Sequence, residues 1–421
     1  MKKNIWIWNH YATDTFYNKG GRHYWFAENL IKSGYKTTIF CANACHNSDK
    51  IINISKGKYI TKAVEDIPYV FVKTVAYKGN GLQRIKNMIA FYRNLFPVAK
   101  EYAQLYGKPD IIFASSVHPL TLVAGIKIAK KFGGPCVCEV RDLWPESLVA
   151  YGFLKRNNIF TKILYQGEKW IYKNADKLIF TMEGGKDYII EHGWNKESGG
   201  PIDLDKVHHI NNGIDLDLFN FNKENFTVDD IDLDNPQILK VVYAGSIRHV
   251  NNVKSIIYAA DIIKNNFSNK IKFIIYGDGS EREYLEKYCL EKKINNVVFK
   301  GFVDKKYIPY ILNKCDLNIM HFNQNSIKKY GASLNKMFEY FASGKPTLSD
   351  CEFGYDLIKK YNCGIVVDNA NAEQLAKAVV KIYEMSEEEY NEYCKNAIIV
   401  AKDYDYKILT DKLVKYILGA N

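Results

Sequence analysis

The stretch Ser333-Leu334-Asn335-Lys336-Met337-Phe338-Glu339-Tyr340-Phe341-Ala342-Ser343-Gly344-Lys345-Pro346 carries helix signals at both of its ends. Ser333 is typical of a helix N-cap, and Gly344 followed by Pro346 is typical of a helix stop. A helix N-terminus presents unpaired N–H groups and about half a positive charge, so it attracts anions. The stretch therefore predicts a short helix that opens at a phosphate group.

Two charged residues make this helix informative. Lys336 adds a positive charge near its start, and Glu339 follows three residues later on nearly the same face. A carboxylate that accepts hydrogen bonds from sugar hydroxyls, beside a helix end that holds phosphate, suits a nucleotide-sugar. An ordinary amphipathic helix, packed through Met337, Phe338 and Phe341 with Glu339 in solvent, is the alternative.

Length and composition bound the class of protein. A chain of 421 residues is long for one domain, and 47% hydrophobic residues with mixed charge indicate a globular protein with sizeable cores. The nine cysteines form no CxxC pair, and Cys136 and Cys138 alternate along an expected strand as buried thiols. The start of the chain has no signal-peptide pattern, and no stretch has the roughly 20 apolar residues of a membrane span. We expect a cytoplasmic protein.

Strand-like runs alternate with helical ones twice along the chain. The first series of expected strands comprises Asn4–Trp8, 36–41, 69–75, 110–114, Cys136–Val140, Lys177–Phe180 and 207–210. The second comprises 239–243, 272–276, 297–300, Leu317–Met320, 346–349 and 364–367. Such alternation predicts two doubly wound α/β domains with parallel sheets.

We expect an acidic, Asn-rich linker at 215–236 between these domains. The first domain then covers residues 1–217 with a returning C-terminal helix at 402–421, and the second covers 218–401. Ligands of such domains bind at the carboxyl ends of the strands, which places the expected site in a cleft between the two sheets.

Several strand ends carry residues suited to that site. Gly20 and Gly21 would let backbone approach a phosphate, and Gly245 ends the first strand of the second series. Arg248 and Lys254 follow as a cation pair that could clamp a diphosphate and stabilise it as it leaves. Two solvated surface charges are the alternative for that pair.

Further strand ends offer weaker candidates. The loop Gly277-Asp278-Gly279-Ser280-Glu281-Arg282 is a turn that could hold a base or ribose. Arg141 and Asp142 end another strand, and the Asp142 carboxylate suits proton transfer or hydroxyl recognition. His118 is a strand-end candidate too, although a structural His before Pro119 fits equally well.

The formal charge of +11 predicts an anionic partner. Two segments, 84–96 and 154–173, combine Lys and Arg with aromatic and aliphatic residues at helical spacing, the composition of an interfacial helix. Packing of both helices on their own domain is the alternative. Nucleic acid is not expected, because no stacking motif or recognised module accompanies the charge.

In its ordered motifs the chain resembles the retaining, GT-B-fold family 4 glycosyltransferases over nearly its whole length. The motifs are Gly20-Gly21, His209-Ile210-Asn211-Asn212-Gly213-Ile214-Asp215, Tyr243-Ala244-Gly245 with Arg248 and Lys254, Tyr276-Gly277-Asp278-Gly279, Phe299-Lys300-Gly301, the 336–346 helix, and Cys363-Gly364-Ile365-Val366-Val367. Residues 139–147 and 330–333 also resemble the L-fucosamine transferases of bacterial surface-polysaccharide synthesis.

The resemblance implies a role for each matching residue. Arg248 and Lys254 would bind the donor diphosphate, Glu339 would bind the ribose hydroxyls, and Asp142 would be the catalytic candidate. The implied donor-binding set is Gly20, Gly21, Gly245, Arg248, Lys254, Gly277, Gly301, Phe302, Ser333, Leu334, Asn335 and Glu339; the implied acceptor-binding set is His118, Arg141 and Asp142.

The chain departs from the family at one position. Glu339 matches the second carboxylate of the Glu-x7-Glu motif, but the first would fall at Gly331. How the transferred sugar is held is therefore open, with Asn335 or backbone near Gly331 as candidates.

The resemblance implies that the enzyme transfers a sugar from a nucleotide diphosphate sugar, which is expected to be UDP-linked and to carry an N-acetylated amino sugar in one version of the prediction. The transfer would retain the configuration at the anomeric carbon and would use no metal or other cofactor. The Asp-x-Asp strings at 203–205, 215–217 and 232–234 are then turn and solvated residues rather than a metal site.

The implied acceptor is a lipid-linked glycan, which places the enzyme on the anionic inner face of the cytoplasmic membrane, beside other polysaccharide-assembly enzymes. A non-hydrolysing UDP-sugar epimerase and a non-catalytic nucleotide-sugar-binding scaffold remain as alternatives.

Overall fold

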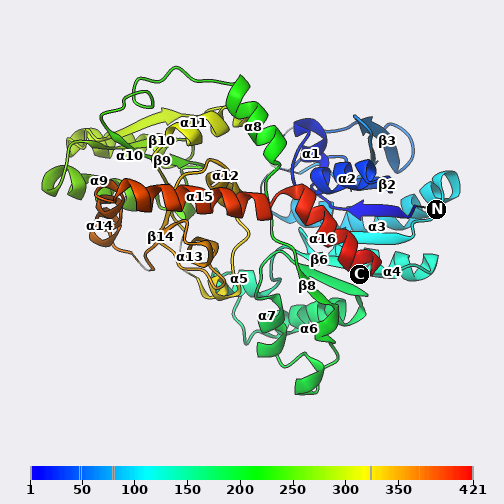
Figure 1. The fold of residues 1–421 in the computed structure, drawn as a ribbon. Helices are drawn as coiled ribbons and strands as arrows, with labels where there is room; N and C mark the ends of the chain where they lie inside the picture. Colours follow the sequence, from blue (N-terminus) through cyan, green and yellow to red (C-terminus); the bar gives the residue numbers. More distant parts are fainter. Residues whose placement is uncertain are drawn as a thin grey trace. The chain divides into compact units, whose positions relative to one another are not determined.

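The structure is a computed structural model that describes residues 2–46, 48, 50–77, 79, 81–322, 325–368 and 370–419. Met1, Ala420 and Asn421, which the predicted first domain included, lie outside the described residues. The chain divides into a first unit, Met1–Asn211 with Tyr406–Asn421, and a second unit, Asn212–Asp405 (Figure 1).

The first unit contains a sheet in the order β3-β4-β2-β1-β5-β6-β7-β8. Every neighbouring pair is parallel except β3 and β4. Its strands are β1 Asn4–Trp8, β2 Lys36–Ala42, β3 Tyr59–Val64, β4 Ile67–Val72, β5 Ile111–Ser115, β6 Cys136–Val140, β7 Lys177–Phe180 and β8 Val207–His209. The central strands β1, β5 and β6 are buried at every residue, as expected of parallel strands covered on both faces.

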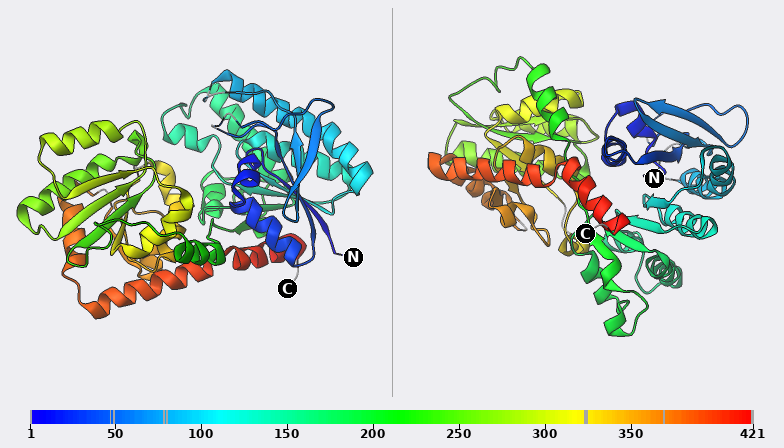
Figure 2. Two further views of the ribbon diagram at one scale, coloured as in Figure 1. Left: turned by 90° about the horizontal axis from the view of Figure 1, so that it is seen from above. Right: turned by 45° about the vertical axis from the view of Figure 1, so that its right-hand side comes forward.

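Helices cover both faces of this sheet (Figure 2). They are α1 Thr13–Asn18, α2 Arg22–Lys32, α3 Leu82–Tyr106, α4 Pro119–Phe132, α5 Glu146–Ala150, α6 Ile159–Asn174, α7 Gly185–Glu191 and α16 Tyr406–Leu418, with the short 3₁₀ turns η1 Lys196–Ser198 and η2 Leu204–Lys206. The C-terminal α16 packs on α2, where the rings of Phe26 and Tyr406 meet edge to face at 5.6 Å. Helices α3, α4 and α6 pack side by side.

The second unit contains a wholly parallel sheet in the order β11-β10-β9-β12-β13-β14. Its strands are β9 Leu239–Ala244, β10 Ile271–Tyr276, β11 Val297–Gly301, β12 Leu317–Met320, β13 Thr347–Ser349 and β14 Gly364–Val366. Its helices are α8 Leu216–Asn225, α9 Val253–Asn266, α10 Arg282–Glu291, α11 Ile308–Lys314, α12 Asn335–Ala342, α13 Leu357–Tyr361, α14 Ala372–Tyr383 and α15 Glu387–Asp403, with η3 His249–Asn251, η4 Lys305–Tyr307 and η5 Ser326–Tyr330. Helices α9, α10 and α14 share one core with the sheet. The predicted fold class, two parallel α/β domains with a final helix on the first, is confirmed.

The domain boundaries differ from the predicted 217/218 and 401/402, because contacts within the second unit begin before residue 218 and continue beyond residue 401. The Asn212 amide donates to Ser333 Oγ at 3.0 Å, and the Ile214 amide donates to the Tyr404 carbonyl at 3.1 Å. The division therefore falls at 211/212 and 405/406.

Two elements contradict the predicted layout. The edge strand β3 is antiparallel to β4 and reaches it through a two-residue turn, in which Glu65 has a φ of 51°. The expected linker at 215–236 contains the helix α8, because the Asp215 side chain caps it by accepting from the Leu218 amide and Phe219 is buried.

The predicted buried thiols of Cys136 and Cys138 are confirmed, and all nine cysteines are free. Within the described ranges, no helix is long and apolar enough to cross a membrane.

Candidate functional site

A cavity of about 640 Å³ lies at the carboxyl ends of β9, β10 and β11 in the second unit, beside the start of α12. This is the edge of a parallel sheet at which ligands bind. The lining residues are Ala244, Gly245, Ser246, Tyr276, Gly277, Asp278, Phe302, Val303, Asp304, Lys305, Ile308, Leu334, Asn335, Lys336 and Glu339. The volume is in the usual range for a small-molecule site.

Glycines let the strand ends approach one another closely here. Gly277 has a φ of 142°, and a Cβ on it would lie 1.8 Å from the Gly245 carbonyl oxygen. The Gly245 amide donates to the Tyr276 carbonyl at 3.0 Å, and the Gly277 amide donates to the Gly301 carbonyl at 2.8 Å. Only glycine fits at position 277, and the loop forms a backbone-lined floor.

Helix α12 begins at Asn335, with Leu334 as its N-cap and no side-chain cap. The predicted N-cap role of Ser333 is wrong, because its hydroxyl accepts from the Asn212 amide and its carbonyl accepts from Asn212 Nδ2 at 2.8 Å. The first-turn N–H groups of α12 thus have no side-chain acceptor, which favours an anion there. The stop at Gly344, with a φ of 67°, is as predicted.

The residues of α12 pack the helix on its own domain and also line the cavity, so both interpretations of this stretch hold in part. Met337, Phe338, Tyr340 and Phe341 are buried, so the helix packs through an apolar face. Glu339 lines the cavity at the same time, and Lys305 Nζ lies 3.4 Å from its Oε1. The Lys305 side chain is 83% exposed, so solvent weakens that ion pair.

The predicted cation pair does not line this cavity. Arg248 is exposed in the loop that precedes η3. Lys254, on α9, donates to the Tyr284 hydroxyl at 3.1 Å, and its ammonium also lies 5.4 Å and 5.7 Å from the ring centroids of Tyr258 and Tyr288. The contacts with Tyr258 and Tyr284 raise the pKa of Lys254, and the three tyrosines hold it over α9 and α10.

In the first unit, the strand-end candidates lie after β5 and β6. Asp142 is exposed at the mouth of a small cavity that it shares with Trp144 and Glu168. Surrounding protein raises the pKa of Asp142, although water at its open surface screens that effect, and neighbouring Arg141 opposes it.

His118 is buried and hydrogen-bonded to His10, with 2.5 Å between His10 Nδ1 and His118 Nε2. Burial, with a smaller effect of Arg84, lowers the pKa of His118 to about 3, so the imidazole is neutral. The His10 ring stacks on Phe91 at 4.4 Å. His10 was not predicted from the sequence, because nothing in the pattern after β1 distinguishes it.

The Gly20-Gly21 loop is anchored by a buried ionic network at the start of α2. The Glu139 carboxylate accepts from Arg22 Nε at 2.7 Å, and it lies 2.9 Å from His23 Nε2 and 2.6 Å from Ser115 Oγ. Burial alone would raise the pKa of Glu139, but Arg22 and His23 outweigh it and hold the pKa far below its usual value. Glu139, Arg22 and His23 were not among the predicted site residues.

A second group that sequence reasoning missed lies over the His10–His118 pair. The rings of Tyr11 and His46 stack at 4.3 Å, and His46 Nδ1 lies 2.6 Å from the Tyr77 hydroxyl. Arg84 Nε donates to the Tyr11 hydroxyl at 2.8 Å. Its members come from four separate segments, so spacing in the sequence carries no signal for it.

The Asp-x-Asp strings were expected to be turn and solvated residues, but Asp232 is largely buried in ion pairs. Asp230 and Asp232 accept from Lys300, and Lys272 also pairs with Asp232. In the described part of the chain, no group of three or more His, Cys, Asp or Glu side chains is placed to hold a metal ion.

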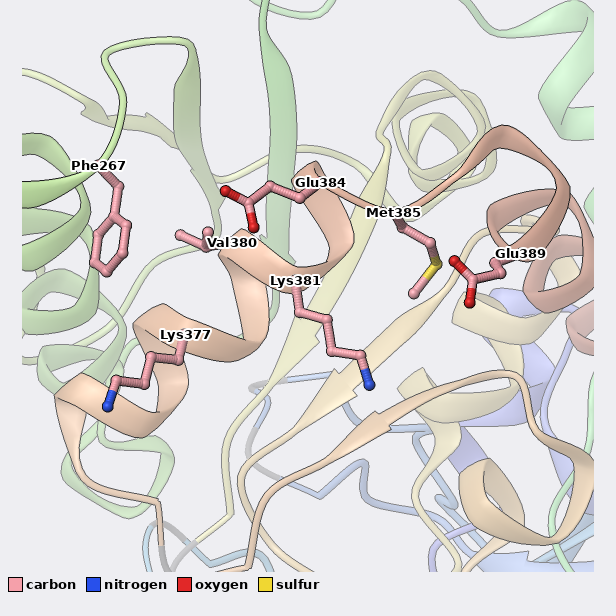
Figure 3. Close-up of a pocket in the computed structure, with 7 residues that line it drawn as sticks. All are labelled: Phe267, Lys377, Val380, Lys381, Glu384, Met385 and Glu389. Carbon is pink, nitrogen blue, oxygen red and sulfur yellow. The ribbon is translucent and has the colours of Figure 1, made fainter.

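A further hollow in the second unit, of about 390 Å³, is lined by side chains of α14 and by Met385 and Glu389 (Figure 3). It lies where α9 and α14 end, and hence at the edge where the strands begin. Because ligands of parallel sheets bind at the other edge, we assign no site to it.

Comparison with known families identifies the two domains. Residues 24–218 match the family described as Glycosyltransferase Family 4, and residues 229–399 match Glycosyl transferases group 1. Both are glycosyltransferase domains.

The GT-B fold that the sequence motifs implied is confirmed by solved structures. Over the whole chain they include sucrose-phosphate synthase from Thermosynechococcus elongatus (TM-score 0.69, 15% identity, 100% of each chain). Alr3699/HepE from Anabaena in complex with UDP aligns with a TM-score of 0.66 and 13% identity, over 99% of this chain and 100% of that chain.

Curated relatives are more similar in sequence. The putative teichuronic acid biosynthesis glycosyltransferase TuaH of Bacillus subtilis is 24% identical over 66% of this chain and 66% of its own length. The probable glycosyltransferase WbjE of Pseudomonas aeruginosa is 22% identical over 59% of each chain. The GT-B domains described here thus span between 55% and 66% of the length of the curated relatives they match.

Proposed function

We propose that this protein is a retaining glycosyltransferase that moves a sugar from a nucleoside diphosphate sugar, UDP-linked, to a hydroxyl of a glycan acceptor. The observation that carries the proposal is the cavity of the second unit, where a glycine-built floor, an uncapped helix start and a carboxylate meet. The complex of the similarly folded HepE with UDP supports a uridine nucleotide as its ligand.

Each wall of the cavity suits one part of such a donor. The N–H groups at the start of α12 suit the diphosphate, and Glu339 suits the ribose hydroxyls. Asp278 and the 77% exposed Phe302 line the remaining side, which we assign to the base. Gly20 and Gly21 of the first unit, and Arg248 and Lys254 of the second, stay proposed donor contacts on the resemblance alone.

The proposed reaction asks the protein for charge stabilisation and positioning rather than for a covalent intermediate. The bond between the sugar C1 and the phosphate oxygen breaks, and its electron pair leaves with the diphosphate. The acceptor oxygen bonds to C1 on the same face, and its proton leaves with the phosphate. We propose that no metal cofactor takes part, and that Asp142 and Arg141 bind the acceptor. His118, which the resemblance assigns to the same role, is buried against His10, so we propose no direct acceptor contact for it.

We further propose that the acceptor is lipid-linked and that the first unit binds an anionic membrane surface. Four apolar side chains at the start of α6 and before it are solvent-exposed: Phe153 by 76%, Ile159 by 76%, Phe160 by 55% and Ile163 by 61%. Lys155, Arg156 and Lys162 lie among them in the sequence. At the start of α3, Leu82 is 76% exposed and Ile85 is 51% exposed, beside Lys86. Such surfaces bind acidic lipids through both apolar and ionic contacts.

Vesicle sedimentation tests the membrane proposal with a matched pair of variants. Phe160 in the first unit and Phe221 in the second are both 55% exposed. We expect Phe160→Ser to reduce binding to vesicles rich in phosphatidylglycerol several-fold and Phe221→Ser to leave it unchanged. Equal effects of the two substitutions, or binding that high salt does not weaken, would contradict this surface.

A donor screen tests the transferase proposal. The protein is incubated with UDP- and GDP-sugars, including N-acetylated amino sugars and L-fucosamine, with and without lipid diphosphate glycans. We expect one donor to release its nucleoside diphosphate only when acceptor is present, and Glu339→Ala to abolish that release. Donor isomerised without acceptor would instead show an epimerase, and donor bound without turnover would show a scaffold.

A further inference from the structure

Lys336 places a positive charge against the glycine floor of the cavity in the second unit. Two lysines line that cavity, Lys305 and Lys336. Lys305 pairs with Glu339 and is 83% exposed, whereas the Lys336 ammonium lies 4.7 Å above the centroid of the Tyr243 ring. A Cβ built on Gly245 would be 3.1 Å from Lys336 Nζ, so the ammonium lies directly against the glycine floor.

No carboxylate forms an ion pair with Lys336 in the described ranges. Its one hydrogen bond is a long contact of 3.5 Å to the Tyr243 hydroxyl, which itself donates to the Ser246 carbonyl. An ammonium in such a place has lost part of its water without gaining a counter-ion. Burial accordingly lowers the pKa of Lys336 to about 8, although Glu339 one turn away raises it. An anion in the cavity would supply the missing partner.

The backbone at the start of α12 also favours an anion in the cavity. Lys336 is the second residue of α12, and the N-cap Leu334 supplies no side-chain acceptor for the N–H groups beside it. The helix dipole and the ammonium therefore act at the same point. The expected cations Arg248 and Lys254 do not line the cavity.

We infer that Lys336 is a catalytic residue that binds the donor diphosphate and stabilises the charge on the leaving nucleoside diphosphate. This inference rests on the proposed function and names a residue for it. The Lys336 ammonium donates to a phosphate oxygen and keeps its proton while the C1–O electron pair moves onto the diphosphate. Such charge-assisted hydrogen bonds are stronger on the fully developed phosphate charge than on the intact donor.

Binding of UDP and of uridine to the full-length protein, measured by calorimetry and by ligand-observed NMR, tests the inference. We expect Lys336→Met to weaken UDP binding about 10- to 100-fold and to leave uridine binding unchanged, which also shows that the cavity is folded. The matched control is Lys305→Met, in the same cavity, for which we expect a less than about threefold loss. Unchanged UDP affinity in Lys336→Met, or a larger loss in Lys254→Met, would overturn it.

If Lys336→Met also loses uridine binding, its loss of UDP binding no longer tests the ammonium by itself. The pH dependence of UDP binding by Lys336→Arg then serves as the test. The charged residues that line the cavity with Lys336 are Asp278, Asp304, Lys305 and Glu339, and the Tyr243 ring lies against its ammonium. Because the pKa of Lys336 is about 8 without ligand, wild-type affinity for UDP should fall about tenfold between pH 7 and pH 9. The Arg variant should show no such fall; equal profiles would overturn the inference. Failure of the wild-type protein to bind any nucleotide would instead refute the proposed function.

Discussion

Glu168 gives the first unit a stability that depends on pH in an unusual direction. Its carboxyl group is buried on α6, where the hydroxyls of Tyr172 and Tyr188 donate to its two oxygens at 2.6 Å and 2.7 Å. Burial, with a smaller effect of Glu146, raises the pKa of Glu168 from 4.5 to about 8, against the effect of the two hydroxyls. The folded unit therefore holds a proton that the unfolded chain has released at neutral pH.

The sign and size of the effect follow from linkage. Because the folded pKa is the higher one, the contribution of Glu168 is fully present below about pH 4.5 and is lost as pH rises through about 8. At about 1.4 kcal/mol for each pH unit, the loss amounts to about 5 kcal/mol. Glu168→Gln removes the titrating group, so the stability of the wild-type protein should fall relative to that of the variant between pH 5 and pH 9.

The assay can follow the first unit alone. All six tryptophans, at positions 6, 8, 25, 144, 170 and 194, lie in the first unit, so urea unfolding monitored by tryptophan fluorescence reports on it. Glu101→Gln, an exposed site on α3, is the matched control and should follow the wild-type profile. A difference between wild type and Glu168→Gln that stays constant within about 1 kcal/mol from pH 5 to pH 9 would refute the reasoning.

Two further substitutions test the strand ends. Glu139→Gln removes the carboxylate charge that Arg22 and His23 contact in this buried network, so we expect the same fluorescence assay to show a loss of about 3 to 5 kcal/mol; a loss below about 1 kcal/mol would mean that the network is solvated in solution. Gly277→Ala forces a Cβ to 1.8 Å from the Gly245 carbonyl, so UDP binding measured by calorimetry should be abolished, and wild-type affinity would show that this loop is not part of the site.

The strands could be predicted because buried parallel strands are short apolar runs, and the structure places a strand at every predicted run. The edge strand β3 was missed since Thr61, Lys62 and Ala63 are exposed and its run lacks the apolar density of the others. Helix α8 was missed because its Asn-rich sequence has low helix propensity. Its stability comes from the Asp215 cap and the burial of Phe219, and the burial becomes visible only with α11 in place.

The site was predictable where residue type alone sets the backbone, as at Gly277, whereas the start of α12 was predicted with Ser333 as its N-cap and has no side-chain cap. The site was not predictable where the contacts of a long side chain depend on which elements pack beside it. Lys254 has Tyr258 one helical turn away, but Tyr284 and Tyr288 reach it only because α10 packs beside α9. The family pattern predicts a donor contact for Lys254, and its contacts here are to these three tyrosines. A loop or side-chain rearrangement would have to accompany any contact with the donor.

The missing first carboxylate of the Glu-x7-Glu motif is a difference in backbone as well as in side chain. Gly331 ends η5 with a φ of 98° and a ψ of 179°, a conformation that a Glu side chain would strain. Its amide donates to the Lys328 carbonyl at 3.0 Å, which holds the turn in this shape. Restoring the motif by substitution would therefore disturb the turn that leads into Ser333 and α12. Since the first carboxylate is absent and the cation pair lies outside the cavity, the charges that α12 itself brings to the cavity are those of Lys336 and Glu339, three residues apart.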